Sequence, residues 1–244
     1  MGAEHEPHRE QEVRSRRETA REDRSAFAHA GEKGLVLGRA AEEQWFIHPR
    51  RVTWNFWSRL AHEPSGLVAA GKSAAFSELA FFHLREFASR VLAGEPTAAR
   101  VVFALPGDYL RDAANEEEKV GLVLGMAGEL RLPVSGLVDH ACAALCDPRG
   151  PAFSPSLPVV VVDTGLDGSD LTLLVQEPTS LVRRAFVRLP QSGLAALLKQ
   201  LTGSCGNRFL RHTTFDILED GRIEQEFFRQ LKDFLWSEAP EFRF

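Results

Sequence analysis

The chain has 244 residues, of which 44% are hydrophobic and 26% charged, with a formal net charge of −5. This composition is ordinary for a globular protein of one large domain or two smaller ones. The acidic balance argues against a general nucleic-acid binder, and no apolar run approaches the roughly 18 residues of a membrane span. The N-terminus has no apolar region of a secretory signal, and three cysteines suit a reducing compartment. We therefore expect a cytoplasmic protein whose partners are neither nucleic acids nor membranes.

Residues 1–33 are dominated by Glu, Arg and His, with Met1, Val13 and Phe27 as the sizeable apolar groups. Such a segment buries too little surface to offset its ordering entropy. The sequence predicts a disordered charged tail here.

Strands and helices then alternate along the chain. Apolar spacing predicts helices over Ser73–Val91, Asp139–Cys146 and Gly193–Leu201 and within Phe215–Trp236. A further helix is predicted to begin at a capping box formed by Asn115 and Glu118 and to end near Leu130. Apolar runs predict strands at Leu35–Leu37, Arg100–Pro106, Leu132–Val138, Val159–Asp163, Leu171–Gln176 and Arg183–Leu189, and a loop at Gly203–Asn207. The fold class is α/β.

The most informative stretch is four consecutive valines ending in Asp163, which read as a strand buried on both faces. A turn with Gly165 and Gly168 follows, and then a second apolar strand that includes Asp170. Glycines let backbone N–H groups approach a phosphate, and a carboxylate can hold a hydrated divalent cation. An ordinary β-hairpin uses the same turn residues, so this stretch alone leaves both interpretations open.

Residues Gly66–Ser73 match the P-loop pattern G-x-x-x-x-G-K-[ST]. A P-loop needs a buried strand directly before its first glycine. Residues 60–65 are polar there and interrupted by Pro64, so the preferred interpretation is a connector with a helix cap. Similarly, His140, Cys142 and Cys146 invite a metal interpretation, but small buried thiols are favoured, because only the two cysteines share a helical face.

The order of elements resembles the actin-like (ribonuclease H-like) ATPase superfamily, and within it the nucleotide-binding domain of the seventy-kilodalton heat-shock (DnaK-type) chaperones. The resemblance covers residues 36–235. The strand at residues 101–106 is similar to the family's "vitVPa" strand, residues 139–144 to its "EPtAAa" segment, and residues 163–170 to its second phosphate loop, "DlGGGtfD". Gly38 and the Pro49–Leu60 stretch resemble the segment that leads to its "fKrliG".

This resemblance implies an ATP and magnesium site. Asp163 would hold Mg²⁺ through water, and Asp139 would lie near the attacking water, so both are the candidate catalytic residues. Gly165, Gly168 and Asp170 would complete the nucleotide-binding set with Asp163. The implied lobes are residues 34–147 and 157–244, both partial, with the crossing between Cys146 and Leu157.

The departures from the family pattern are equally specific. Leu166 and Asp167 replace two glycines of the second phosphate loop, and Gly168 replaces its threonine. The first phosphate loop, "DlGTTns", is not found in residues 1–60, and the adenosine-binding glycine pair is not found before Phe244. We therefore expect a fragment or degenerate member with an incomplete first lobe and weak or no ATP hydrolysis. The alternatives are a non-catalytic interaction scaffold of the same fold, which associates with itself or with a protein partner, and a P-loop NTPase that uses Gly66–Ser73.

Overall fold

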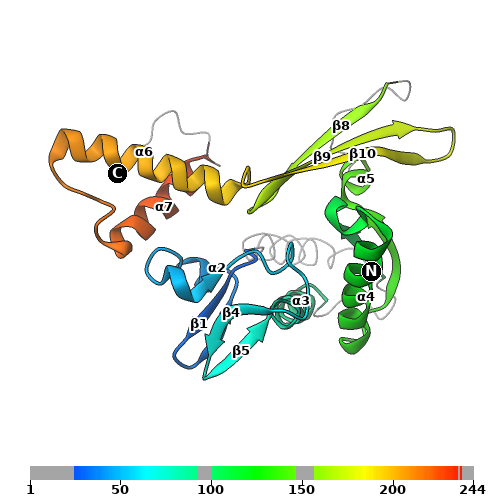
Figure 1. Cartoon of the computed structure of the whole chain (residues 1–244), viewed down its shortest axis with the longest axis horizontal. Helices are drawn as coiled ribbons and strands as arrows, with labels where there is room; N and C mark the ends of the chain where they lie inside the picture. Colours follow the sequence, from blue (N-terminus) through cyan, green and yellow to red (C-terminus); the bar gives the residue numbers. More distant parts are fainter. Residues whose placement is uncertain (1–24, 93–99, 147–156, 236, 238–244) are drawn as a thin grey trace, which may run out of the picture. The chain divides into compact units, whose positions relative to one another are not determined.

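The computed structural model describes residues 25–92, 100–146, 157–235 and 237. Its fold is mixed α/β, with several small sheets (Figure 1). Contacts divide the chain into two units, Met1–Ala99 (unit 1) and Arg100–Phe244 (unit 2). This boundary lies between Ala99 and Arg100, whereas the sequence placed the lobe boundary between residues 147 and 157. Residues 147–156 themselves lie outside the described part of the chain.

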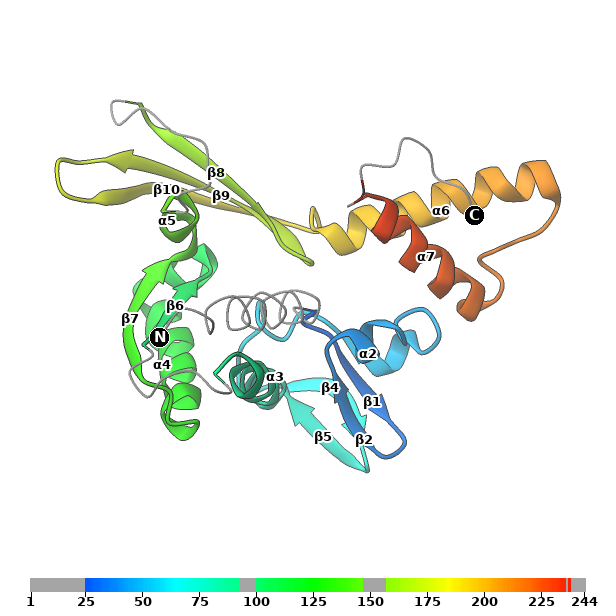
Figure 2. The ribbon, with the colours of Figure 1, turned by 180° about the vertical axis from the view of Figure 1, so that it is seen from behind.

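Unit 1 combines two small antiparallel sheets with one long helix (Figure 2). Its elements are β1 (Ala28–Gly31), β2 (Gly34–Leu37), α2 (Arg39–Glu42), a 3-10 turn (Pro49–Arg51), β3 (Val52–Thr53), β4 (Pro64–Ala69), β5 (Lys72–Ala75) and α3 (Phe76–Val91). The first sheet has the order β2-β1-β3, and β4 pairs with β5.

The central strand β1 corrects one prediction from the sequence. It lies in the stretch expected to be a disordered tail, yet Phe27, Ala28 and Ala30 are almost completely buried. Phe27 packs against Trp45 and Trp54, with ring centroids 5.4 and 5.9 Å apart. Long-range aromatic partners therefore order residues 25–33, while residues 1–24 lie outside the described part.

The helix α3 confirms the helical period that begins after Ser73. Its first turn closes when the Glu78 carboxylate accepts a hydrogen bond of 2.8 Å from the backbone N–H of Ala75. Phe76, Leu79 and Ala80 are buried, as an apolar face of this spacing requires. His83 on this helix is a packed residue, as expected, because its Nδ1 accepts a bond of 3.2 Å from the indole N–H of Trp57.

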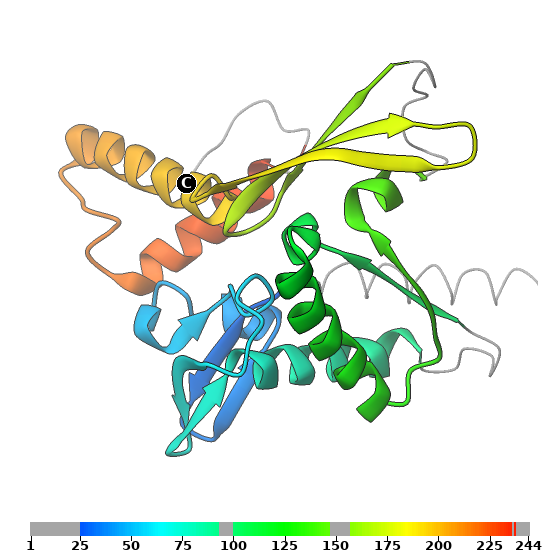
Figure 3. The ribbon, with the colours of Figure 1, turned by 45° about the vertical axis from the view of Figure 1, so that its right-hand side comes forward.

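Unit 2 contains a parallel strand pair, an antiparallel meander and a pair of helices (Figure 3). Its elements are β6 (Val101–Leu105), a 3-10 turn (Gly107–Leu110), α4 (Ala113–Glu129), β7 (Val134–Asp139), α5 (His140–Leu145), β8 (Val159–Thr164), β9 (Gly168–Gln176), β10 (Leu181–Pro190), α6 (Leu194–Thr213) and α7 (Gly221–Leu235). β6 pairs in parallel with β7, and the meander has the order β10-β9-β8. Thus β6 and β8 lie in different sheets.

Two helix boundaries differ from the predictions. The N-cap of α4 is Asp112, whose Oδ1 accepts a bond of 2.9 Å from the N–H of Asn115, so the predicted capping box at Asn115 and Glu118 is wrong. The helix α6 continues through the predicted loop at residues 203–207. It does so because α7 packs along it, with Ile217, Phe227 and Leu231 in a shared core that also contacts Cys205 and Phe209.

The valine strand β8 is not buried on both faces, contrary to the prediction. Val160 and Val162 are 57% and 61% exposed. Val159 and Val161, which point to the other face, are less exposed. The exposure of successive valines alternates because the described part of the chain covers one face of the meander more than the other.

Candidate functional site

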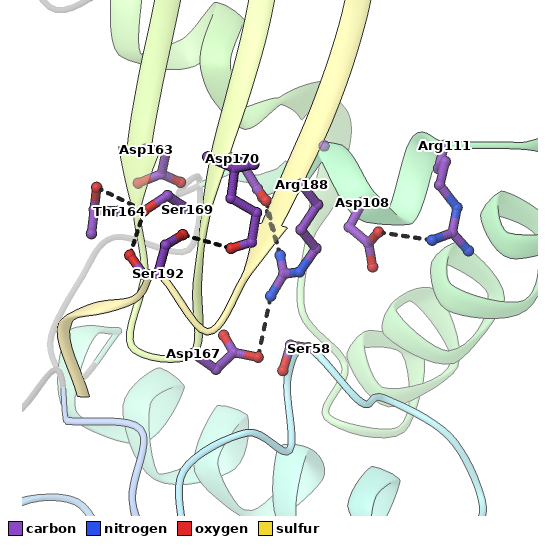
Figure 4. A network of polar contacts seen from close by, with 12 residues as sticks. Ser58, Asp108, Arg111, Asp163, Thr164, Asp167, Ser169, Asp170, Arg188 and Ser192 are labelled. Carbon is purple, nitrogen blue, oxygen red and sulfur yellow. Dashed lines mark hydrogen bonds and ion pairs between the residues drawn. The ribbon is translucent and has the colours of Figure 1, made fainter. Parts of the chain in front are cut away.

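A row of charged side chains crosses the three-stranded meander of unit 2. Asp163 of β8 lies opposite Asp170 of β9 in the strand register, and Asp170 lies opposite Arg188 of β10. Directly opposite residues point to the same face of a sheet, and Figure 4 shows these three side chains together. Two carboxylates and one guanidinium therefore share one face at the end of β8.

Arg188 joins the turn to the strands. Its Nη1 lies 3.0 and 3.3 Å from the two carboxylate oxygens of Asp170, and its Nη2 lies 3.1 Å from Oδ2 of Asp167 (Figure 4). Burial lowers the pKa of Arg188, but the carboxylates of Asp170 and Asp167 outweigh it and raise the pKa above its ordinary value. The guanidinium is therefore a permanent cation bridging both carboxylates.

The carboxylate of Asp163 has a hydrogen-bonding partner of its own. Its Oδ2 lies 2.8 Å from Nδ1 of His140, the first residue of α5. This hydrogen bond raises the pKa of His140 and lowers the pKa of Asp163, in both cases against the effect of burial. Burial raises the pKa of Asp170, although Arg188 opposes the rise. The row thus consists of two carboxylates, with the guanidinium of Arg188 at one end and the imidazole of His140, whose pKa is raised, at the other.

The turn at residues 165–168 is closed by hydrogen bonds of its own chain. The N–H of Gly165 donates to the carbonyl of Gly168 at 2.9 Å. The carbonyls of Gly165 and Leu166 accept from the N–H groups of Leu194 and Ala195 at 2.8 and 2.9 Å. The first amides of α6 are therefore directed at the turn, which removes them as donors for a phosphate.

Gly193, the N-cap of α6, allows this close contact. A Cβ on Gly193 would lie 2.4 Å from the backbone nitrogen of Gly168 and 2.4 Å from the carbonyl oxygen of Leu166. Only glycine fits between the turn and the helix. The need for a glycine at position 193 could not be predicted from the sequence, because no local pattern indicates the contact between the turn and the helix.

Asp139, the last residue of β7, caps a helix and holds an arginine of another strand. Its Oδ1 accepts a bond of 2.9 Å from the N–H of Ala141, which caps α5. Its Oδ2 accepts a bond of 3.1 Å from Nη1 of Arg183, which also donates to the carbonyl of Gly107 at 3.1 Å. Arg183 thereby ties β10 to the end of β7 and to the turn after β6.

The predicted site residues are thus brought together in part. Asp163, Gly165, Gly168 and Asp170 lie around one strand end, and Asp139 lies one residue before His140, which contacts Asp163. Sequence reasoning missed Arg183 and Arg188, and it considered His140 only as a metal ligand. One signal in the sequence could have indicated the ion pair. Arg188 lies between two apolar residues of a predicted strand, and a charged side chain in such a place usually needs a partner of opposite charge.

A magnesium–triphosphate group fits this arrangement poorly. Asp163 already has the imidazole of His140 beside it, and Asp170 has the guanidinium of Arg188. The carboxylate of Asp167 stands in the turn that would receive the phosphates, where like charges repel.

Residues Gly66–Ser73 form a β-hairpin in unit 1. β4 and β5 are joined through Ala70 and Gly71, whose φ angles of 50° and 77° meet the requirement of a type I′ turn. Lys72 and Ser73 belong to β5, and α3 begins only at Phe76. A P-loop passes directly from its lysine and serine into a helix, so this geometry gives no support to the P-loop hypothesis. The expected connector with a helix cap is likewise a hairpin.

Comparisons with known proteins assign no family to this chain: no protein-family model matches it, and a search of curated proteins found no match. Within the residues described, no helix is both long and apolar enough to cross a membrane.

Proposed function

We propose that this chain is a degenerate relative of the actin-like ATPases, similar to the nucleotide-binding domain of DnaK-type chaperones, with weak or no ATP hydrolysis. The resemblance of residues 36–235 supports the relationship. The observation that supports the loss of activity is the pairing of Asp163 with His140 and of Asp170 with Arg188. In this proposal, side chains of the protein replace the cation that the carboxylates would hold in an active relative.

The residues of the turn at positions 165–168 also support a loss of ATP hydrolysis. Leu166 and Asp167 add bulk and negative charge where the family has glycines, and the amides of Leu194 and Ala195 donate to the turn. One donor aimed at a reacting anion is typically worth about 2.7–4 kcal/mol of barrier. The family's first phosphate loop, which supplies backbone donors to the transferring phosphoryl group, is not found in residues 1–60. The loss of several such donors together would leave almost no acceleration of phosphoryl transfer.

Calorimetric titration of the full chain with Mg-ATP, paired with a steady-state hydrolysis assay, tests this proposal. We expect weak or undetectable binding and no steady hydrolysis, with the same result for Asp163→Ala. Steady hydrolysis that disappears in Asp163→Ala would overturn the proposal and establish an ATPase that uses Asp163. Hydrolysis that survives Asp163→Ala but disappears in Lys72→Ala would instead support the P-loop alternative.

A second candidate function is an interaction scaffold, which the exposed face of the meander favours. Val162, Leu171 and Val187 form a row across the three strands, and Val162 and Val187 are 61% and 53% exposed. Antiparallel sheets usually carry polar residues on a solvent face. Contiguous exposed apolar residues mark surfaces that associate with protein, so we propose a protein partner or a second copy of this chain.

Sedimentation velocity over a range of protein concentrations tests self-association. We expect the wild-type chain to sediment faster as its concentration rises, and Val162→Lys to remove that dependence. Leu197→Lys is the matched control, because Leu197 is 48% exposed but lies on α6. A wild-type chain that stays monomeric at every concentration would contradict self-association.

The strand pair β6–β7 supports the expectation of an incomplete sheet. Val102 and Leu137 are 58% and 40% exposed, and a two-stranded sheet is marginally stable on its own. We expect amides of Val101–Leu105 to exchange faster than those of Val159–Val162 in a hydrogen-exchange measurement. Equal protection in a dilute monomer would contradict the proposed incomplete sheet.

A further inference from the structure

Unit 1 buries a histidine on its central strand, and one nitrogen of the imidazole has no hydrogen-bond partner among the described residues. His29 of β1 is 8% exposed, and within the described residues its Nε2 is buried and has no partner. Its ring is stacked on the ring of His48, with centroids 5.7 Å apart and an angle of 5° between the planes. A proton on His29 would therefore charge a ring whose buried Nε2 has no acceptor and which is stacked on a second imidazole.

The charges around His29 offer no compensation. The strands β2, β3 and β4 that contact β1 carry no titratable side chain. The 3-10 turn contributes Arg50 and Arg51. The helix α2 contributes Arg39 and Glu42, of which Glu42 accepts a bond of 2.9 Å from Ser25. Burial, and then the neighbouring His48 and Arg51, lower the pKa of His29.

A second histidine of the same unit is also held neutral. The Nδ1 of His83 can accept from the indole of Trp57, at 3.2 Å, only while that nitrogen has no proton. The rings of Phe56 and Trp57 pack on His83. The guanidinium of Arg59 lies over the ring of Phe76, and β5, which contacts α3, carries Lys72. Burial lowers the pKa of His83 in spite of a hydrogen bond with the backbone of Ser25.

We propose that unit 1 contains an acid-sensitive switch, in which protonation of the buried His29 and the half-buried His83 opens the sheet β2-β1-β3 and separates α3 from Phe56 and Trp57. Both imidazoles are neutral in the folded state of unit 1 and carry a proton in the opened state. The sign follows from linkage: a histidine whose folded pKa is lowered leaves stability unaffected above its ordinary pKa and reduces it as the pH falls below that value. The switch therefore acts below about pH 6.5.

Hydrogen exchange of the full chain between pH 7.5 and 5, corrected for the intrinsic pH dependence of exchange, tests the switch. Each proton taken up on opening lowers the protection factor by up to about tenfold per pH unit. We expect this loss for amides of β1 and α3, while amides of β9 in unit 2 serve as the internal reference. Unchanged protection of β1 and α3 at pH 5 would overturn the proposal.

Two variants assign the effect to the histidines. His29→Phe and His83→Phe keep an aromatic ring but cannot be protonated, so each is expected to reduce the pH dependence, and the double variant to remove it. His212→Gln is the matched control, because His212 is an exposed residue of α6. A double variant with the wild-type pH dependence would exclude these histidines. If the variants do not fold, NMR titration of the wild-type imidazoles decides, since titration of both at their ordinary pKa would equally overturn the proposal.

Discussion

Asp163 of β8 faces Asp170 of β9 directly across the strand pair. Like charges in this position normally destabilise a sheet. Here each carboxylate has a nitrogen partner: the imidazole of His140 lies 2.8 Å from Asp163, and the guanidinium of Arg188 lies 3.0 Å from Asp170. These four side chains form one polar network with Asp167, which also pairs with Arg188, and each is expected to depend on the others.

The first prediction concerns the pKa of His140. In Asp163→Asn the hydrogen bond to a carboxylate is lost, so the pKa of His140 should fall toward or below its ordinary value. NMR titration of the imidazole protons measures this shift. Asp233→Asn on α7 is the control and should leave His140 unchanged. An unaltered His140 pKa in Asp163→Asn would contradict the pairing.

The same pair predicts a pH dependence of stability. The pKa of His140 is raised, so its contribution is complete below about pH 6.5 and is lost as the pH rises through the raised value. The pKa of Asp163 is lowered, so its contribution is lost only in strong acid. The difference in unfolding free energy between wild type and Asp163→Asn should therefore shrink on going from pH 6 to pH 9. Denaturant unfolding at several pH values checks this.

Arg188→Gln should destabilise unit 2, because it leaves the mostly buried carboxylate of Asp170 and that of Asp167 without their cation. Losing a charged hydrogen-bond partner at a partly buried site costs about 1.5–3 kcal/mol. Arg184→Gln removes an exposed pair with Glu177 and should cost less than about 1 kcal/mol. Urea unfolding of both variants measures the difference. Equal effects would mean that Arg188 contributes no more than a surface charge.

Gly193→Ala tests the contact between the turn and α6. The added methyl group would overlap the backbone of Gly168 and Leu166, and such overpacking costs about 1–3 kcal/mol. Gly203→Ala, also on α6, has open space around the new methyl group and should stabilise the helix by about 0.5–1 kcal/mol. Thermal unfolding should therefore move in opposite directions for the two variants. A neutral Gly193→Ala would show that the turn is not held against the helix.

Ala70→Gly should stabilise the hairpin of β4 and β5, since Ala70 has a φ of 50°, a region that costs a side chain about 1 kcal/mol. Ala74→Gly, within β5, has no such strain to relieve and should be destabilising by about 0.5–1 kcal/mol. Denaturant midpoints of the two variants provide the test. A destabilised Ala70→Gly would indicate a different turn geometry.

Local patterns in the sequence were sufficient for several elements. The helical period after Ser73 and the amphipathic stripe of α7 predicted helices, because an apolar face of that spacing needs a core to cover it. The apolar runs that became β6, β7 and β8 predicted strands for the same reason. The predictions failed where distant partners decide, as in β1, whose aromatic neighbours lie in another segment, and in α6, which α7 extends through a predicted loop.

For the candidate site too, local patterns in the sequence predicted one part, and distant partners decided the other. Asp163, Gly165, Gly168 and Asp170 lie within eight residues of each other in the sequence, and a hairpin necessarily places them together. The sequence therefore determined which carboxylates meet. Only the tertiary structure decided what neutralises them, because His140 precedes Asp163 by 23 residues and Arg188 follows Asp170 by 18. Ion pairing depends on which side chains the long-range packing and the strand register bring within about 4 Å, and no local pattern carries that information.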